Sequence, residues 1–258
     1  MVKKRSSILL GITTLILGLS GPALVSRAAL SATPAVSIDS QPLGVSVRRT
    51  VIPAYTFMTT DPLEHGHPAF VRLALGSQDP NRQEAVLSVY PLAGLLSTNP
   101  GDEGRRIQAQ ISRLRTLIKT RTNKVQGELP YLLEPNSSQV FAAAPRYLDF
   151  PGASGLRYLT MYSFDASPVT NDRMFYTFQG LTTDGRYALV LTYPVSTRHL
   201  PANDDAVPSA LRTALEQGVG YSAYLTRTAR TLSAARPADF SPPLDKLDAV
   251  ARSIRIRH

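Results

Sequence analysis

His65 and His67 form the only cluster in the chain that has the character of metal ligands. The two imidazoles are two positions apart in Glu64-His65-Gly66-His67, so they could share one ion. The chain contains no cysteine, and no third ligand follows at a telling distance. The pattern is therefore more typical of a solvated loop, and we predict no metal site.

Motifs for covalent catalysis and for nucleotide binding are missing. Gly152-Ala153-Ser154-Gly155 lacks the Gly-x-Ser-x-Gly spacing of a nucleophile elbow, and no Walker-type or dinucleotide-binding glycine pattern occurs. The carboxylates available for paired acid and base chemistry fit turns or helix starts better: Asp165, Asp172, Asp184, Asp204 and Asp205. We therefore predict no catalytic residues and no cofactor. A triad is recognised by its geometry, however, so a site assembled from loops such as 165–172 stays open as an alternative.

A basic surface is predicted on the segment 102–124, which has the period of a helix. Apolar residues at spacings of four, three and four define one face: Ile107, Ile111, Leu114 and Ile118. Basic residues occupy the far side and its flanks: Arg105, Arg106, Arg113, Arg115 and Lys119. If this surface has a role beyond solubility, we expect Arg113 and Lys119 to bind an anionic polymer of the cell envelope. The charges are not interleaved with aromatic residues, which argues against nucleic acid as the partner.

The best-specified element is a hairpin over 175–193. Its two apolar-aromatic runs meet at Asp184-Gly185, which favours a tight turn with positive φ at both central residues. The register fixed by this turn pairs Tyr176 with Tyr193, Phe178 with Leu191, and Gly180 with Leu189. That face is apolar and belongs in the core. The opposite face is mixed, and we expect a helix to cover it in part. The candidate binding residues are the polar members of this second face, at an opening between sheet and helix: Thr177, Gln179 and Thr192.

The other elements follow the order strands, helix, strands, helices and a last strand. Strands are predicted over 45–52, 54–58, 68–76 and 84–91 before the helix, and over 146–150 and 156–164 after it, while 139–143 is either loop or strand. A four-three rhythm predicts a long helix over 211–232, which Gly218 and Gly220 could break. A short helix over 244–250 and a strand over 253–257 end the chain. The fold class is therefore α+β, a single antiparallel sheet flanked by helices.

The first 28 residues have the pattern of a secretory signal peptide. A basic start, Lys3-Lys4-Arg5, precedes an apolar run over 8–19, and Ser26-Arg27-Ala28 offers small residues where a signal peptidase cuts. The run is shorter than the ~20 residues of a spanning helix, although retention as an anchor is the alternative. Cleavage lowers the formal charge from +9 to +5, because four basic residues and no acidic residue are lost.

We therefore expect a secreted or periplasmic protein with no transmembrane segment after cleavage. Residues 29–42 are rich in Ala, Ser, Thr and Pro and lack periodicity, so we predict a disordered leader there. A single α+β domain over 43–258 is the simplest organisation for the rest of the chain.

Several segments together resemble an uncharacterised family of exported bacterial proteins and lipoproteins. The likeness rests on Gly155-Leu156-Arg157-Tyr158-Leu159-Thr160, on the run from Phe175 to Thr182, on Asp184-Gly185-Arg186-Tyr187, on Pro194-Val195 and on Leu200-Pro201. This chain departs from the lipoproteins because it has no lipid-bearing cysteine. The resemblance implies no catalytic residue. Its order of strands and helices is similar to that of PsbP/Mog1-like domains, which is an analogy of fold alone.

These observations favour a non-catalytic exported domain that binds a ligand or a protein partner in the envelope. Two alternatives stay open. One is an extracytoplasmic hydrolase with a loop-assembled site, for which Asp165, Asp172 and His199 would be needed. The other is a structural accessory of a larger envelope complex.

Overall fold

Seven antiparallel strands form the main sheet of the computed structural model, which describes residues 34–55, 66–79, 82–122, 127–133 and 137–257. The strands lie in the order β2 (Val47–Ile52), β3 (Phe70–Leu75), β4 (Val86–Pro91), β8 (Tyr187–Pro194), β7 (Phe175–Thr182), β6 (Ala153–Ser163) and β5 (Ser138–Phe150). The chain builds one half of the sheet from β2 to β4 and the other half from the opposite edge, β5 to β8. The second hairpin strand, β8, therefore closes the sheet against β4.

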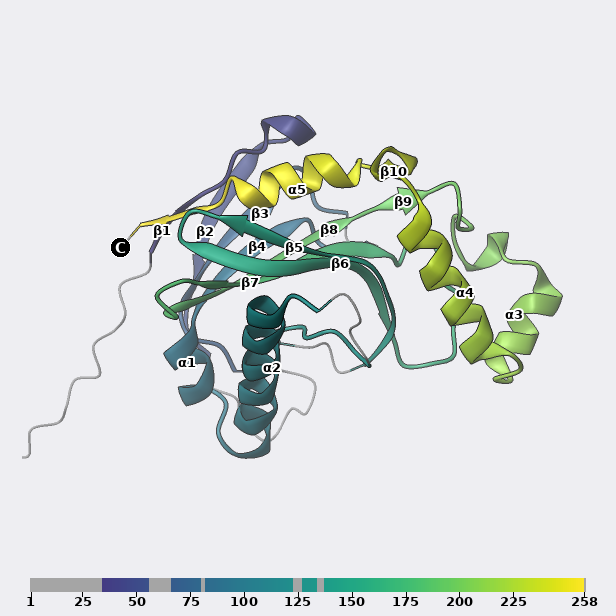
Figure 1. The fold of residues 1–258 in the computed structure, drawn as a ribbon, viewed down its shortest axis with the longest axis horizontal. Helices are drawn as coiled ribbons and strands as arrows, with labels where there is room; N and C mark the ends of the chain where they lie inside the picture. The colour runs from purple at the N-terminus through teal and green to yellow at the C-terminus, as the bar shows by residue number, and fades with distance from the viewer. Residues whose placement is uncertain (1–33, 56–65, 80–81, 123–126, 134–136, 258) are drawn as a thin grey trace, which may run out of the picture. The chain divides into compact units, whose positions relative to one another are not determined.

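Helices cover both faces of this sheet. They are α1 (Leu92–Ser97), α2 (Gly101–Thr120), α3 (Ser209–Glu216), α4 (Tyr221–Ala234) and α5 (Leu244–Arg252). α2 buries Ile107, Ile111 and Leu114 against one face, whereas α5 buries Leu244 and Leu247 against the other. Figure 1 shows α2 and α5 on opposite sides of the strands. The predicted fold class, α+β with a single main antiparallel sheet, is confirmed.

The hairpin of β7 and β8 has the predicted register: Tyr176 pairs with Tyr193, Phe178 with Leu191, and Gly180 with Leu189. Its turn differs from the expected type, because φ is positive at Gly185 (70°) but not at Asp184. The amide of Gly185 instead donates to the Thr182 carbonyl over 2.9 Å. The Asp184 carboxylate accepts hydrogen bonds from the Thr182 hydroxyl and from two N–H groups of Arg186. These bonds, that of Thr182 above all, hold the pKa of Asp184 well below its usual range.

Two glycines leave room for an aromatic ring on the core face of the hairpin. Gly155 of β6 and Gly180 of β7 pair directly across the strands, and the buried ring of Phe178 lies against both. A Cβ added to Gly180 would lie 2.6 Å from Phe178 Cε1, and one added to Gly155 would lie 2.5 Å from Phe178 Cε2. Glycine is needed at both positions because a side chain would overlap the ring, and at Gly155 it would also overlap the Gln179 carbonyl oxygen, 2.3 Å from such a Cβ.

The first described residues, from 34 on, are part of the fold, so the expectation of a disordered leader over 29–42 does not hold for residues 34–42. Strand β1 (Ala35–Ser37) pairs with β11 (Arg255–Arg257) at the other end of the chain, and Val36 is buried in the core. A short helical turn, η1 (Gln41–Leu43), follows β1. Composition alone cannot show this, because the partner that orders the segment lies more than two hundred residues away. The signal peptide predicted for 1–28 and residues 29–33 lie outside the described residues.

Two elements differ from their expected lengths. The predicted helix over 211–232 is two helices, α3 and α4, because Gly218 (φ 74°) and Gly220 (φ 67°) adopt left-handed conformations between them. Asp204 and Asp205 belong to a separate turn, η2 (Asp204–Ala206). In contrast, the region 138–150 is one long strand, β5, whose register shifts between Ala143 and Arg146.

The smaller elements complete the arrangement. β9 (Ser196–Thr197) pairs with β10 (Phe240–Ser241), which follows η3 (Pro237–Asp239). In the predicted strand over 54–58, Tyr55 makes a single bridge to His67, and 56–58 lies outside the described residues. No helix in the described parts of the chain combines the length and the apolar character needed to cross a membrane.

Candidate functional site

A cleft of about 370 Å³ opens on the face of the sheet that also carries α2. It lies over β3, β4 and β8, beside the part of this face that α2 covers. The segment 131–133 forms one side of it. Its lining residues are Ile52, Phe70, Arg72, Glu84, Val86, Ser88, Tyr90, Tyr131, Leu132, Leu133, Val190 and Thr192. The volume is within the range of about 300–1,000 Å³ that is usual for small-molecule sites.

Strand register brings the polar residues of this cleft together. Arg72 of β3 pairs with Ser88 of β4, and Ser88 pairs with Val190 of β8. Because side chains alternate between the faces of a strand, Tyr90 and Thr192 point to the same side as these three. The cleft floor is therefore a strip of alternate residues from three neighbouring strands.

The charged group of the cleft is an ion pair between Arg72 and Glu84. Arg72 is partly buried, while Glu84 is exposed. The hydroxyl of Thr192 donates to the backbone carbonyl of Glu84 over 2.7 Å, which ties the start of β4 to β8. The pair thus presents a donor next to an acceptor, beside the hydroxyls of Ser88 and Thr192 and the aromatic wall of the cleft.

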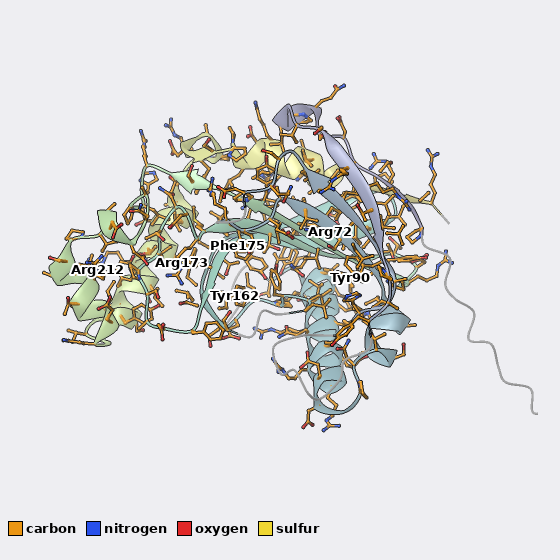
Figure 2. All side chains as sticks on the ribbon, turned by 180° about the vertical axis from the view of Figure 1, so that it is seen from behind. Arg72, Tyr90, Tyr162, Arg173, Phe175 and Arg212 are labelled. Carbon is orange, nitrogen blue, oxygen red and sulfur yellow. The ribbon has the colours of Figure 1, made fainter. Side chains whose placement is uncertain are left out.

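Aromatic rings form the neighbouring wall. The ring centroids of Phe70 and Tyr90 are 4.3 Å apart, and His67 packs edge-on against Phe70 at 5.1 Å. Figure 2 shows Arg72 and Tyr90 close together on the sheet. Burial raises the pKa of Tyr90, although the nearby Ser88 hydroxyl and Arg72 guanidinium act in the opposite direction. The phenol therefore stays protonated, and able to donate, at neutral pH.

Thr177 and Gln179, two of the residues predicted to bind, are fully buried beside the cleft. The Gln179 side chain accepts a hydrogen bond from the Leu132 amide at 3.0 Å and donates one to the Thr177 hydroxyl at 2.8 Å. Both residues therefore position the segment 131–133 that borders the cleft. Thr192 is the member of the predicted set that lines the cleft itself.

The structure does not bring Arg113 and Lys119 into this site or onto one surface. They are six positions apart on α2, so their side chains leave the helix in directions about 120° apart. Lys119 is exposed, whereas Arg113 is half-buried. Near the start of the helix, Arg105 and Arg106 pair with Asp102 and Glu103. The basic face is consequently narrower than its count of arginines suggests.

The residues of the hydrolase alternative do not form a triad. The loop 165–172 is held to the segment 197–202. The Asn171 side chain exchanges hydrogen bonds with the backbone of Thr197, and the amides of Asn171 and Asp172 donate to the carbonyls of Pro201 and Ala202. Among the described residues, no hydrogen bond joins the His199 ring to Asp165 or Asp172. The described parts of the chain contain no group of three or more His, Cys, Asp or Glu side chains that could hold a metal ion. His65, one of the two histidines of the candidate cluster, lies outside the described residues.

Sequence reasoning missed Arg72, Ser88, Tyr90 and Tyr131. A signal for them exists, because Arg72 interrupts the apolar strand Phe70–Leu75 and Ser88 and Tyr90 share one parity of Val86–Pro91. When every second residue of an otherwise apolar strand is polar, the face of the sheet that carries those residues is not wholly covered.

Fold and site together define an α+β domain with an open, polar-floored cleft on one face of its sheet. Comparisons with protein-family models, with curated proteins and with solved structures find no match to this chain. The resemblance to exported proteins of the PsbP/Mog1-like arrangement therefore stays a prediction, and function must be argued from the site.

Proposed function

We propose that the protein is a non-catalytic, exported ligand-binding domain, and that its ligand occupies the cleft over β3, β4 and β8. The observation that carries the proposal is the Arg72–Glu84 pair set beside the Phe70–Tyr90 rings on rigid strands. Sites built on strands hold their geometry better than sites on loops. The N-terminal pattern of residues 1–28 supports export.

The chemistry of the cleft suits a small ring compound with one apolar face and several hydroxyl groups, such as a saccharide. A hydroxyl both donates and accepts hydrogen bonds, and the guanidinium and carboxylate of the pair offer a donor and an acceptor side by side. The rings of Phe70 and Tyr90 offer area for the apolar face of the ligand, and the Tyr90 phenol adds a polar contact. The hydroxyls of Ser88 and Thr192 are also within the lining.

Titration calorimetry with a panel of soluble mono- and disaccharides tests this proposal. We expect Arg72→Ala and Tyr90→Ala each to weaken binding at least tenfold, which is about 1.4 kcal/mol. Arg49→Ala is the matched control, because Arg49 lies on the neighbouring edge strand at the parity facing away from the cleft. Equal affinity in Arg72→Ala and Arg49→Ala would contradict the proposal.

The two alternatives give different results in the same preparation. A hydrolase would turn over a substrate in an activity screen and lose that turnover in Asp172→Ala or His199→Ala. A structural accessory would co-purify with envelope proteins and bind none of the saccharides. Either outcome would replace the ligand-binding proposal.

A further inference from the structure

A second hollow of about 370 Å³ lies between α3 and α4, and its lining comes entirely from residues 199–232. Its apolar walls include Leu211, Leu215, Val219 and Leu232. Leu215 and Leu232 are buried, whereas Leu211 is 40% exposed and Val219 is 63% exposed. Apolar side chains thus continue from the interior of this groove to the solvent, as in a site that receives an apolar group from outside.

Among the described residues that line the groove, Arg227 carries the formal charge. None of the described lining residues is acidic. The Arg227 side chain is exposed, and within the described chain no acidic side chain lies within ion-pair distance of it.

Four other arginines near this groove have aspartate partners. Arg173 and Arg212 have ion-pair contacts with Asp204 and Asp205, and Figure 2 shows these two arginines in the region of α3 and α4. Arg198 and Arg236 both reach Asp239. These four arginines contact aspartates, whereas Arg227 lines an apolar groove and has no acidic partner among the described residues.

We propose that this groove binds a linear amphipathic carboxylate of the fatty-acid class. The alkyl chain lies against Leu211, Leu215 and Val219, and the carboxylate pairs with the Arg227 guanidinium, which presents donors in the geometry that a carboxylate accepts. A purely apolar partner would leave the guanidinium beside a dry surface without a counter-charge. A two-fold contact with a second copy would place two like-charged grooves face to face.

Titration calorimetry of the full chain with sodium decanoate tests this inference. We expect saturable binding of one decanoate, a loss of at least tenfold in affinity for Arg227→Ala, and a similar loss for Val219→Asp, which places a negative charge in the alkyl path. Arg230→Ala is the matched control, because Arg230 is exposed on the same helix but does not line the groove. Arg72→Ala should bind decanoate as the parent does, since the cleft over β3 and β4 is a separate site.

Head-group specificity provides the second measurement. Decyltrimethylammonium has an alkyl chain of similar length and the opposite charge, and it should bind at least tenfold more weakly than decanoate. Four results would overturn the inference: no decanoate binding by the parent chain, equal affinity of Arg227→Ala and Arg230→Ala, equal affinity for both head groups, or a dimer in size-exclusion chromatography that Val219→Asp converts to monomer. Because Arg227 and Val219 are exposed, both variants should melt at the parental temperature without ligand, so a change in affinity reports the groove.

Discussion

Arg157 of β6 donates a hydrogen bond from Nε to Oδ1 of Asp248 in α5 over 3.0 Å, and both side chains are almost fully buried. The Tyr176 hydroxyl donates to the same oxygen at 3.2 Å, and Arg146 approaches Oδ2 at 3.4 Å. A charged pair is thus enclosed between the sheet and the helix that covers its second face. It fixes the position of α5, since a helix shifted along the strands would lose the contacts of Asp248 with Arg157 and Arg146.

Replacing Asp248 by Ala should destabilise the protein by about 3–5 kcal/mol, because it leaves the Arg157 charge buried without its partner. Urea unfolding followed by circular dichroism measures the change. Arg146→Ala is the control, since Arg146 is 54% exposed and its pair should contribute no more than about 1 kcal/mol. If the two variants lose similar stability, the enclosed pair has no special role.

Replacing Gly180 by Ala should cost about 1–3 kcal/mol, because the added methyl group would overlap the Phe178 ring. A double-mutant cycle with Phe178→Leu checks the cause, since the smaller side chain makes room for the methyl group. We expect the double variant to be more stable than the sum of the two single changes predicts. Strict additivity would show that the ring is not what excludes a side chain at this position.

Stability should fall as pH rises above about 10. Burial raises the pKa of Tyr131 and of Tyr176 above the usual value of about 10, and the carboxylate of Asp248 raises that of Tyr176 further. The unfolded chain then loses protons that the folded chain keeps, so stability is complete below about pH 10 and is lost above it. Free energies of unfolding between about pH 8 and pH 12 measure this slope. Tyr131→Phe should flatten it, and an unchanged slope in that variant would contradict the assignment.

Binding to an anionic polymer, if α2 provides it, should depend on Lys119 more than on Arg113. Lys119 is exposed, while Arg113 is half-buried and directed elsewhere. Retention on an immobilised anionic polysaccharide should fall steeply with salt, because exposed charges are screened within about 8 Å at physiological ionic strength. Lys119→Glu should elute at lower salt than the parent, and Arg113→Glu should change elution less. If both variants elute at the same salt concentration as the parent, α2 does not bind the polymer.

The hairpin and α2 could be predicted because their signals are local. Asp184-Gly185 fixes the register within a few residues, and the apolar period of α2 is read over three turns. The cleft could not be predicted in the same way. Thr192 reaches the carbonyl of Glu84, 108 positions earlier, only because β8 closes against β4. A single sequence does not show which strands of the two halves become neighbours.

The same limit explains the buried roles of Thr177 and Gln179. Alternation placed them correctly on the second face of the hairpin, but it could not show that the segment 129–133 folds over them. Gln179 is satisfied by the Leu132 amide, a contact between residues 47 positions apart. Polar residues on a partly covered face can therefore serve the protein's own backbone as readily as a ligand, and sequence does not distinguish the two.

The pairing of β1 with β11 sets an order for the formation of the fold. A polypeptide leaves the ribosome with its N-terminus first, so residues 35–37 emerge long before their partners at 255–257. Val36, which is buried in the folded protein, therefore cannot pair with Ile256 until the last residues have been synthesised. Chains that stop short of Arg255 lack this closure, and their first strand is left as an unpaired, protease-accessible segment.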